Sequence, residues 1–423
     1  MKKFLSLILL ASSVSGFAGG FQLNVQSTRS LGMGGAYAGF ARGTESIFFN
    51  PGGMCNLKGH NFTLGGTLIM PLVSLQTDVY DNINQTSPMA TPIQFYYGGQ
   101  ITDNLFVGLG INNQFGSSSS FEDDWQGRFI VQNISLKTFS YQPTVAYKIH
   151  DYFSIGAGFV ITTGNFAYEK AVPLTGTTTS EGKAVLTGSG ITYGFNVGVF
   201  STLVDNDKMK LTIGGDYRSG QTINLENGLA KFTDIPLSLQ GSFPAETNFT
   251  GKLNLPSVIT AGFAYQYNIN ENNSLTLVYD FNYTGWSSYD TLAFDFENAD
   301  TPDSKTTKAW TNTTTQRFGI EYALNDMFFF RAGGYYDITP VQDGFVSPEL
   351  PDVTQFVPTF GFGMQIGDHF AFDLAYLHQD VARTASLDDA GFTANYHRIA
   401  DVISFSTTIK LFNSEASSAP RVN

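Results

Sequence analysis

The sequence predicts an all-β protein: a 14-stranded antiparallel transmembrane β-barrel with an N-terminal hatch, or plug, inside its lumen. Three observations lead to this prediction: an export signal, strands that alternate apolar and polar residues, and a regular succession of short and long connections. The composition agrees, because 14% of the residues are charged and the chain holds 44 Gly and 38 Phe. An ordinary globular domain carries about 25% charged residues. Barrels use aromatic residues in their outer girdles and small residues where the wall curves.

Residues 1–18 have the features of a signal peptide. Lys2 and Lys3 form a positive start, and the apolar run of residues 4–11 is too short to span a bilayer as a helix. Residues 16–18 form a plausible cleavage site, so the mature chain would begin near Gly19. No later run of residues is apolar for the length that a transmembrane helix needs. The sequence up to this point therefore predicts either a secreted soluble protein or an outer-membrane barrel.

The alternation of apolar and polar residues predicts strands with one apolar face. It is clearest in residues 274–283 and recurs in residues 316–322 and 403–411. In the first of these, one face carries Leu275, Leu277, Tyr279, Phe281 and Tyr283, and the other carries Thr276, Asp280 and Asn282. This pattern also fits a β-sandwich, so it does not by itself decide between the two folds.

The connections between the strands favour the barrel. Short polar turns are expected at residues 102–104, 150–152, 205–207, 270–273, 325–326 and 367–369. Long polar connections are expected at residues 76–90, 116–135, 170–183, 226–248, 287–308, 339–355 and 384–396. Short and long connections alternate, as the periplasmic turns and extracellular loops of a transmembrane barrel do. Seven long and six short connections predict fourteen strands within residues 58–412, followed by a polar tail at residues 413–423.

Charge, cysteine content and glycine spacing argue against nucleic-acid binding, an internal disulfide and a nucleotide-binding site. The net charge of −13 argues against nucleic-acid binding, which needs clustered Lys and Arg. Cys55 is the sole cysteine and has no partner for an internal disulfide. The glycines at Gly32 and Gly34 do not form a nucleotide-binding motif, because Tyr37 occupies the position of the third glycine. We expect no cofactor and no metal, and we expect a monomer whose other neighbours are outer-membrane lipid and lipopolysaccharide.

Residues 19–57 lack the strand alternation and form the predicted hatch. A fourteen-stranded barrel is wide enough to hold such a segment, because eight strands are filled by side chains and sixteen leave a channel. Apolar contacts of the hatch are expected from Phe21, Leu23, Phe48 and Phe49. Four large apolar residues in this segment favour a plug inside the lumen over a free periplasmic tail.

Several motifs in order along the chain resemble the FadL family of outer-membrane transporters for long-chain fatty acids and aromatic hydrocarbons. Asn50-Pro51-Gly52 is similar to that family's Asn-Pro-Ala hatch motif, with glycine in place of alanine. The opening residues 20–24 are similar to the family's mature N-terminus. Further similar stretches are residues 124–129, 255–256, 283–287, 331–341 and 347–352. The resemblance covers nearly the whole mature chain.

The resemblance implies a mechanism of passive uptake. An apolar ligand, most simply a long-chain fatty acid and alternatively an aromatic hydrocarbon, would be captured between extracellular loops and move to a pocket in the lumen. Hatch movement would then open a lateral exit at a kink in the third strand. That strand is expected at residues 105–113, and Gly108 and Gly110 are its candidate kink positions.

A fatty-acid carboxylate needs a cation, and three arginines are candidates. Strand parity places Arg317 and Arg331 on the lumen side of neighbouring strands, and Arg128 lies in the second long loop. The alternative is an internal salt-bridge ladder, because Glu321 should lie across the hairpin from Arg331.

Two other functions compete with hydrophobic uptake. An outer-membrane enzyme would need a histidine with a nucleophile or an acid near the rim, and only His378, close to Asp380, has such a setting. A general polar porin is disfavoured by the predicted hatch. We therefore expect a non-enzymatic channel in the outer membrane of a Gram-negative bacterium.

Overall fold

The chain forms a closed barrel of fourteen antiparallel strands, as the sequence predicts. A computed structural model describes residues 19–80, 82–86, 88–174 and 181–411. The predicted signal peptide (1–18) and polar tail (413–423) lie outside the described residues. Among the described residues, no helix has the length and apolar character needed to cross a bilayer.

The wall is built from twenty strand segments, some of which join end to end into one barrel strand. They are β1 (His60–Gln76), β2 (Ile83–Asn84), β3 (Ile93–Gln100), β4 (Leu105–Asn112), β5 (Gly116–Ser120), β6 (Asn133–His150), β7 (Phe153–Pro173), β8 (Glu181–Asp205), β9 (Met209–Arg218), β10 (Gln221–Thr233), β11 (Glu246–Leu255), β12 (Val258–Asn270), β13 (Asn273–Thr284), β14 (Thr291–Phe296), β15 (Ser304–Thr307), β16 (Thr313–Leu324), β17 (Phe328–Asp337), β18 (Gln355–Ile366), β19 (Phe370–Leu387) and β20 (Phe392–Leu411). The pairs β2/β3, β4/β5, β9/β10, β11/β12, β13/β14 and β15/β16 each form one barrel strand. Short 3-10 turns lie at η2 (Leu237–Leu239), η3 (Trp286–Ser288) and η4 (Asp388–Ala390).

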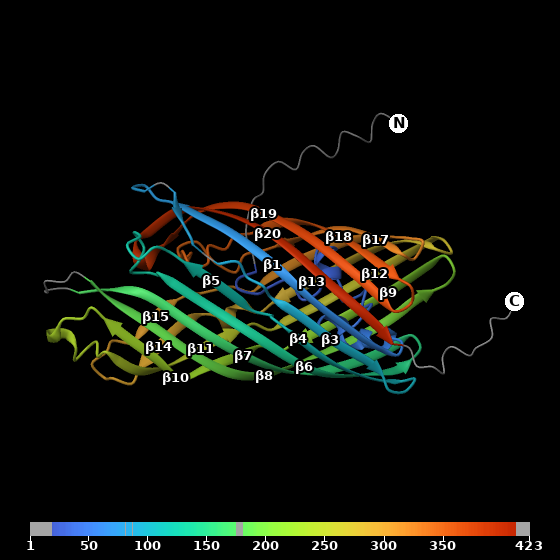
Figure 1. Cartoon of the computed structure of the whole chain (residues 1–423), viewed down its shortest axis with the longest axis horizontal. Helices are drawn as coiled ribbons and strands as arrows, with labels where there is room; N and C mark the ends of the chain where they lie inside the picture. Colours follow the sequence, from blue (N-terminus) through green and yellow to red (C-terminus); the bar gives the residue numbers. More distant parts are fainter. Residues whose placement is uncertain (1–18, 81, 87, 175–180, 412–423) are drawn as a thin grey trace, which may run out of the picture.

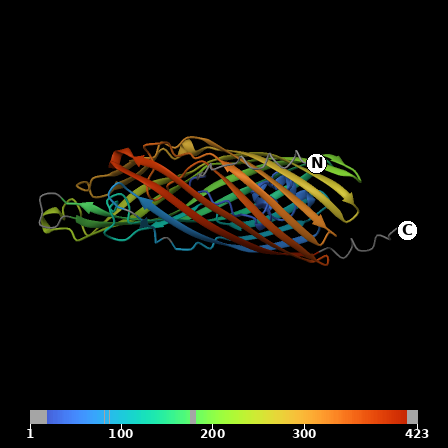
Figure 2. The same ribbon diagram turned by 90° about the horizontal axis from the view of Figure 1, so that it is seen from above.

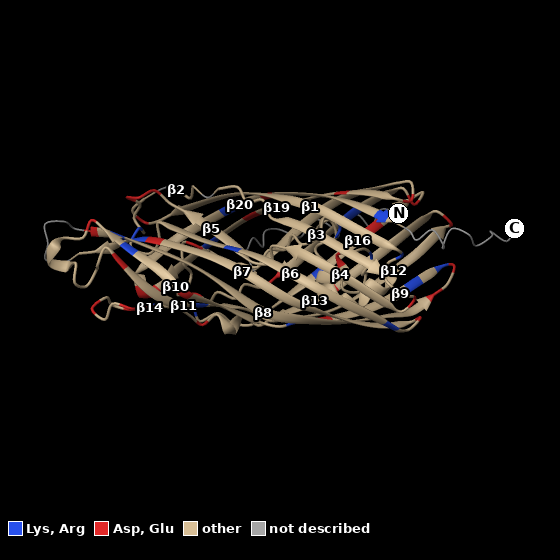
Figure 3. Ribbon diagram, turned by 60° about the horizontal axis from the view of Figure 1, so that its bottom comes forward, with Lys and Arg blue, Asp and Glu red and all other residues tan. Residues whose placement is uncertain are grey.

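The first and last strands close the barrel. β1 pairs with β20 along its whole length, from His60 opposite Leu411 to Gln76 opposite Asn395. Figure 1 shows the two strands side by side, and all strands tilt strongly against the long axis. Closure satisfies the backbone donors and acceptors that an open sheet edge would expose to lipid. Most of the length of the wall strands carries neither Lys or Arg nor Asp or Glu (Figure 3).

All six predicted short turns join consecutive strands at one end of the barrel, which we call the turn end. Asn325 and Asp326 both have positive φ angles of 54° and 50°. Such a pair is typical of the two-residue hairpin turns whose twist matches that of the strands.

At the opposite, loop end the strands are longer than predicted. β7 and β8 have 21 and 25 residues, although about ten residues suffice to cross a bilayer. Parts of the predicted long connections are therefore strands that continue beyond the membrane. The sequence pattern missed them because no lipid is present there to require an apolar outer face.

The hatch, residues 19–57, lies inside the barrel nearer the turn end (Figure 2). It contains α1 (Thr28–Leu31), α2 (Ser46–Phe49) and η1 (Pro51–Asn56). α1 packs on β18 and β19, whereas η1 packs on β6, β7 and β8. The hatch therefore contacts distant parts of the wall and occupies the lumen between them.

Glycine at position 34 allows the hatch backbone to approach the wall. Gly34 has a φ angle of +69°, and a Cβ atom there would lie 2.3 Å from the carbonyl oxygen of Gly334 in β17. Its own N–H donates to the Thr359 hydroxyl at 2.9 Å. Gly34 thus serves close packing of the hatch against the wall.

We expect Gly34→Ala to loosen the hatch, because it adds about 1–2 kcal/mol of left-handed backbone strain and a contact with fixed wall backbone. Single-channel conductance in planar bilayers should rise as the hatch leaves its seat. Gly367→Ala is the matched control, since Gly367 also has a positive φ of +57° but nothing lies within 4 Å of its added Cβ. Equal conductance of the two variants would contradict the packing role of Gly34.

Candidate functional site

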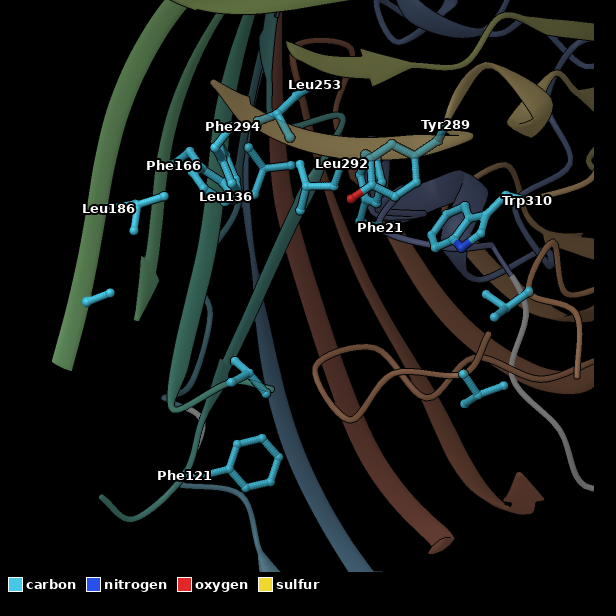
Figure 4. Packing of buried hydrophobic residues seen from close by; sticks show 14 of the residues in the cluster. Phe21, Phe121, Leu136, Phe166, Leu186, Leu253, Tyr289, Leu292, Phe294 and Trp310 are labelled. Atoms are coloured by element: carbon cyan, nitrogen blue, oxygen red, sulfur yellow. The ribbon is translucent and has the colours of Figure 1, made fainter. Parts of the chain in front are cut away.

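An apolar cavity lies inside the loop half of the barrel, above the hatch. It has a volume of about 50 Å³, and its apolar lining includes Phe21, Leu136, Phe166, Leu253, Tyr289 and Trp310. Figure 4 shows these side chains arising from several strands and loops and from the hatch. Because strands far apart in sequence contribute to the lining, only closure of the barrel assembles this cavity.

The first residues of the hatch form part of the cavity. The ring of Phe21 lies 4.9 Å from Trp286, 5.2 Å from Tyr289 and 5.7 Å from Trp310, measured between centroids. At Gly20 a Cβ atom would lie 2.5 Å from the Trp310 ring. A molecule that enters the cavity and displaces Phe21 therefore acts directly on the hatch.

One ammonium group borders the apolar lining. Lys308, in the connection between β15 and β16, places its Nζ 2.7 Å from Oε1 of Glu349. Both side chains are about nine-tenths buried, with exposed fractions of 9% and 12%. Burial alone lowers the pKa of Lys308, but the Glu349 carboxylate outweighs burial and the net pKa is raised. Lys308 is therefore charged. Its ammonium group has three N–H donors, of which one is used in the hydrogen bond to Glu349.

The third barrel strand is interrupted beside this cavity. β4 ends at Asn112 and β5 begins at Gly116; among the described residues β5 pairs with β6 but not with β3. The hatch supplies partners on the free side: Leu23 N–H donates to the Gln114 carbonyl at 2.9 Å, and Gly116 N–H donates to the Phe21 carbonyl at 3.0 Å. The hatch thus takes the place of a strand at this break in the wall.

The break is not at the glycines that the sequence indicated. Gly108 and Gly110 lie within β4, which pairs without a register shift with both β3 and β6. Instead they make room for the hatch, because a Cβ at Gly108 would lie 2.7 Å from Ile47 and Met54. The interruption falls at residues 113–115, where side chains and hatch backbone replace the strand ladder.

The structure does not bring the three candidate arginines together at the apolar cavity. Arg128 pairs with Glu181 at 2.8 Å in the loops. Arg317 donates to Asn24 at 2.9 Å and to Asn282 at 3.0 Å. Strand parity was right that Arg317 points into the lumen, but there it binds the hatch.

Arg331 belongs to an internal ion-pair network, which was the alternative considered from the sequence. Its Nε lies 2.6 Å from Glu321 and its Nη1 lies 2.6 Å from Asp373. Arg29 of the hatch adds a pair to Asp373 at 3.4 Å, and Arg42 lies 3.9 Å from Glu321. The network therefore ties the hatch to β16, β17 and β19.

The hatch motif fastens η1 to β8. Asn50 Nδ2 donates to the carbonyls of Ala38 and Val199, both at 2.9 Å, and Asn50 Oδ1 accepts from Gly52 N–H at 3.1 Å. Pro51 begins η1, where its missing N–H costs nothing. Gly52 sits against the wall, because its Cβ would lie 3.0 Å from the Gly198 carbonyl oxygen.

The other predicted hatch contacts lie where apolar packing is expected. Phe48 lies under the Arg218 guanidinium at 4.3 Å, and Phe49 lies 5.0 Å from both Phe48 and Tyr37. Leu23 packs partly against a buried cluster that includes β17 to β20. Each of these residues contributes to fixing the hatch.

His378 has no catalytic arrangement in the described part of the chain. Its Nδ1 lies 2.9 Å from Asp401, whereas Asp380 pairs with His397 at 2.7 Å. All four side chains are well exposed, and no nucleophilic hydroxyl of a Ser or Thr joins them. The described residues also contain no cluster suited to hold a metal ion.

Sequence reasoning missed Lys308 as the cation of the cavity. Lys308 follows a four-residue strand in a long loop, where strand parity gives no direction. Trp286 and Trp310 offered a signal, because these two rare, large apolar residues flank the long polar connection predicted at residues 287–308.

We expect Asn50→Ala to detach η1 from the wall, because it leaves the buried carbonyls of Ala38 and Val199 without their donor. An unsatisfied buried group costs about 1–3 kcal/mol. Hydrogen exchange at the backbone amides of residues 52–57 should accelerate strongly. Asn56→Ala, which removes a single 3.3 Å hydrogen bond from an exposed side chain of the same hatch, is the control. Unchanged exchange in Asn50→Ala would refute the fastening role.

Comparisons with known proteins identify the family. The long-chain fatty acid transport protein of Salmonella typhi is 24% identical over 410 residues, covering 89% of this chain and 91% of that protein. Outer membrane protein P1 of Haemophilus influenzae is 23% identical, covering 89% and 90%. A Pseudomonas aeruginosa FadL homologue of known structure aligns with a TM-score of 0.79 at 18% identity, covering 93% of this chain and all of that one. The toluene transporter TodX of P. putida aligns with a TM-score of 0.73 at 15% identity, covering 94% and 99%.

The family match spans almost the entire chain. Residues 8–410 match the family described as outer membrane protein transport protein (OMPP1/FadL/TodX). The turn end of the barrel is therefore periplasmic and the loop end extracellular. This chain is a member of the OMPP1/FadL/TodX family, an outer-membrane β-barrel transporter of hydrophobic compounds.

Proposed function

We propose that the protein takes up long-chain fatty acids passively through the outer membrane. The observation that carries this proposal is the apolar cavity with one buried ammonium group, Lys308. A fatty acid has the matching chemistry, an apolar chain and one carboxylate. Transfer of the chain from water to an apolar cavity gains about 0.8 kcal/mol per CH₂, and the ammonium offsets the cost of desolvating the carboxylate.

Relatives support two ligand classes. The curated relative from Salmonella typhi is named for long-chain fatty acids, and a structural neighbour is named for toluene. An aromatic hydrocarbon also matches the chemistry of Phe21, Tyr289 and Trp310 in the lining, so it is the second candidate. Either ligand requires the cavity of about 50 Å³ to widen, as it does when Phe21 is displaced. The buried Lys308 favours the fatty acid, because a hydrocarbon has no group for a cation to bind.

The exit in this proposal is lateral. A ligand that displaces Phe21 removes the hatch backbone that pairs with residues 114–116, and the break in strand three then opens toward the bilayer. An apolar molecule avoids water on this route. The exit requires no metal, cofactor or chemical reaction.

We expect the double substitution Lys308→Met and Glu349→Gln to weaken oleate binding about tenfold or more, because a hydrogen bond to a charged group contributes about 1.5–3 kcal/mol. The paired change avoids leaving Glu349 buried without its cation. Binding of oleyl alcohol, which lacks the carboxylate, should change little. Lys305→Met is the control, because Lys305 lies in β15, three residues before Lys308, and is exposed. Equal loss of oleate and oleyl alcohol binding would contradict the carboxylate role.

A disulfide across the break tests the lateral exit. Gln22 and Phe115 form an isolated antiparallel bridge, and such partners lie about 4.5–5.5 Å apart at their Cα atoms, within disulfide range. The variant Gln22→Cys with Phe115→Cys, in a Cys55→Ala background, should lose oleate uptake when oxidised and regain it when reduced.

The reduced form of this variant controls for the loss of the Phe115 ring. Undiminished uptake by the oxidised form would overturn the hatch-and-gap mechanism. Passage of small hydrophilic sugars as fast as oleate through the unmodified protein would instead support a general porin.

A further inference from the structure

A second, larger cavity lies on the other side of the hatch, at the periplasmic end. It has a volume of about 880 Å³, within the usual range of ligand sites. The underside of the hatch forms its roof through Phe40, Arg42, Cys55 and Leu57, and strands β4, β6, β8, β9 and β12 form its sides. We call this cavity the vestibule.

The vestibule has a positive lining in an acidic protein. Four cations line it, namely Arg42, Lys58, Lys148 and Lys210, against one carboxylate, Asp103. The whole chain carries a net charge of −13, so the net charge of this lining is opposite in sign to that of the protein. A cleft lined by one sign of charge concentrates ligands of the opposite sign.

Two of these cations are not neutralised by carboxylates. Lys210 pairs with Asp205 at 2.7 Å, and Arg42 lies 3.9 Å from Glu321. Within the described ranges, neither Lys58 nor Lys148 has a carboxylate at salt-bridge distance; Lys148 instead lies 5.9 Å from the Phe106 ring centroid. These two ammonium groups therefore remain available to an anion.

The rest of the lining is mixed, and its polar members include Asn56, Gln100, Thr102, Thr212 and Gln266. Its apolar members include Phe40, Leu57, Phe106, Phe200 and Ala264. A small inorganic anion gains nothing from contact with the apolar side chains. An anion with a hydrocarbon chain can bind to the cations and to the apolar side chains at once. The vestibule lies inside the barrel, so a bilayer phospholipid does not reach it, but a single dissolved amphiphile does.

We propose that the vestibule is a binding site for an anionic amphiphile, the monoanion of a long-chain fatty acid. Its carboxylate binds Lys58 and Lys148, and its chain lies along Phe106, Phe200 and the underside of the hatch. The choice of a fatty acid rests on the proposed function; the anionic and amphiphilic chemistry rests on the lining alone. A ligand in this site contacts Arg42 and Phe40 of the hatch. Binding on the periplasmic side therefore acts directly on the hatch.

The test is photolabelling of the full-length processed protein in phosphatidylcholine nanodiscs, which leave both ends of the barrel open to solution. The probe is palmitate with a diazirine in its chain, and labelled peptides are mapped by mass spectrometry. We expect two separate labelled regions: one around Phe21 and Leu253 in the apolar cavity, and one around Leu57, Phe106 and Phe200 in the vestibule.

Charge reversal separates the vestibule from the apolar cavity. Lys58→Glu with Lys148→Glu should reduce vestibule labelling at least about tenfold, a change of about 1.4 kcal/mol, and leave cavity labelling intact. Lys208→Glu is the matched control, because it makes the same charge change in an exposed periplasmic turn that does not line the vestibule. A diazirine-bearing hexadecanol should label the vestibule weakly in every variant. Retained cavity labelling also shows that the double variant has folded.

Each outcome bears on a different proposal. Three results would overturn the vestibule site: no labelling there, labelling that persists in the charge-reversed variant, or equal labelling by the hexadecanol probe. None of these results would contradict the proposed uptake function. Vestibule labelling without cavity labelling supports the vestibule site and counts against the proposed function. If Lys208→Glu also lost vestibule labelling, the loss would be due to the overall surface charge and not to Lys58 and Lys148. That result would overturn the site.

Discussion

The structure depends on one constraint: in lipid, every backbone N–H and C=O must find a partner within the protein. The seam between β1 and β20 meets this constraint for the sheet as a whole. One stretch of wall departs from it, because strand three leaves β3 after Asn112. There the hatch backbone at Phe21 and Leu23 supplies the hydrogen bonds. The hatch is thus part of the wall at the place where the ladder is incomplete.

Directional polar contacts help to set the position of the hatch. The network of Arg29, Asp373, Arg331 and Glu321 is almost fully buried and links the hatch to three strands. Buried ion pairs add little net stability compared with apolar residues, but breaking one is costly because a charge is left unpaired. Such a network therefore defines one seat for the hatch. The Asn50 hydrogen bonds define it in the same way at β8.

Much of the fold could be predicted from the sequence, and less of the site. The six turns follow from short polar stretches between the strands. The lumen-facing parity of Arg317 and Arg331 follows from a period of two, which any strand with one lipid face must show. Lys308 and the break at residues 113–115 could not be found this way. A long loop has no period, and the break depends on hydrogen bonds between the hatch and strand three. Gly108 and Gly110 illustrate the limit, because glycine serves close packing and bending equally well.

The sequence by itself determined that this chain is a closed barrel with a plug, because lipid outside and polar lumen inside impose a pattern on every strand. It determined the family through motifs whose order is specific. Only the tertiary structure decided which cation meets the apolar cavity, which arginines hold the hatch, and where the strand ladder is interrupted. These features join residues from opposite sides of the lumen, such as Phe21 with Trp310 or Arg29 with Asp373. No local pattern in a chain encodes such distances, since they arise only when the last strand pairs with the first.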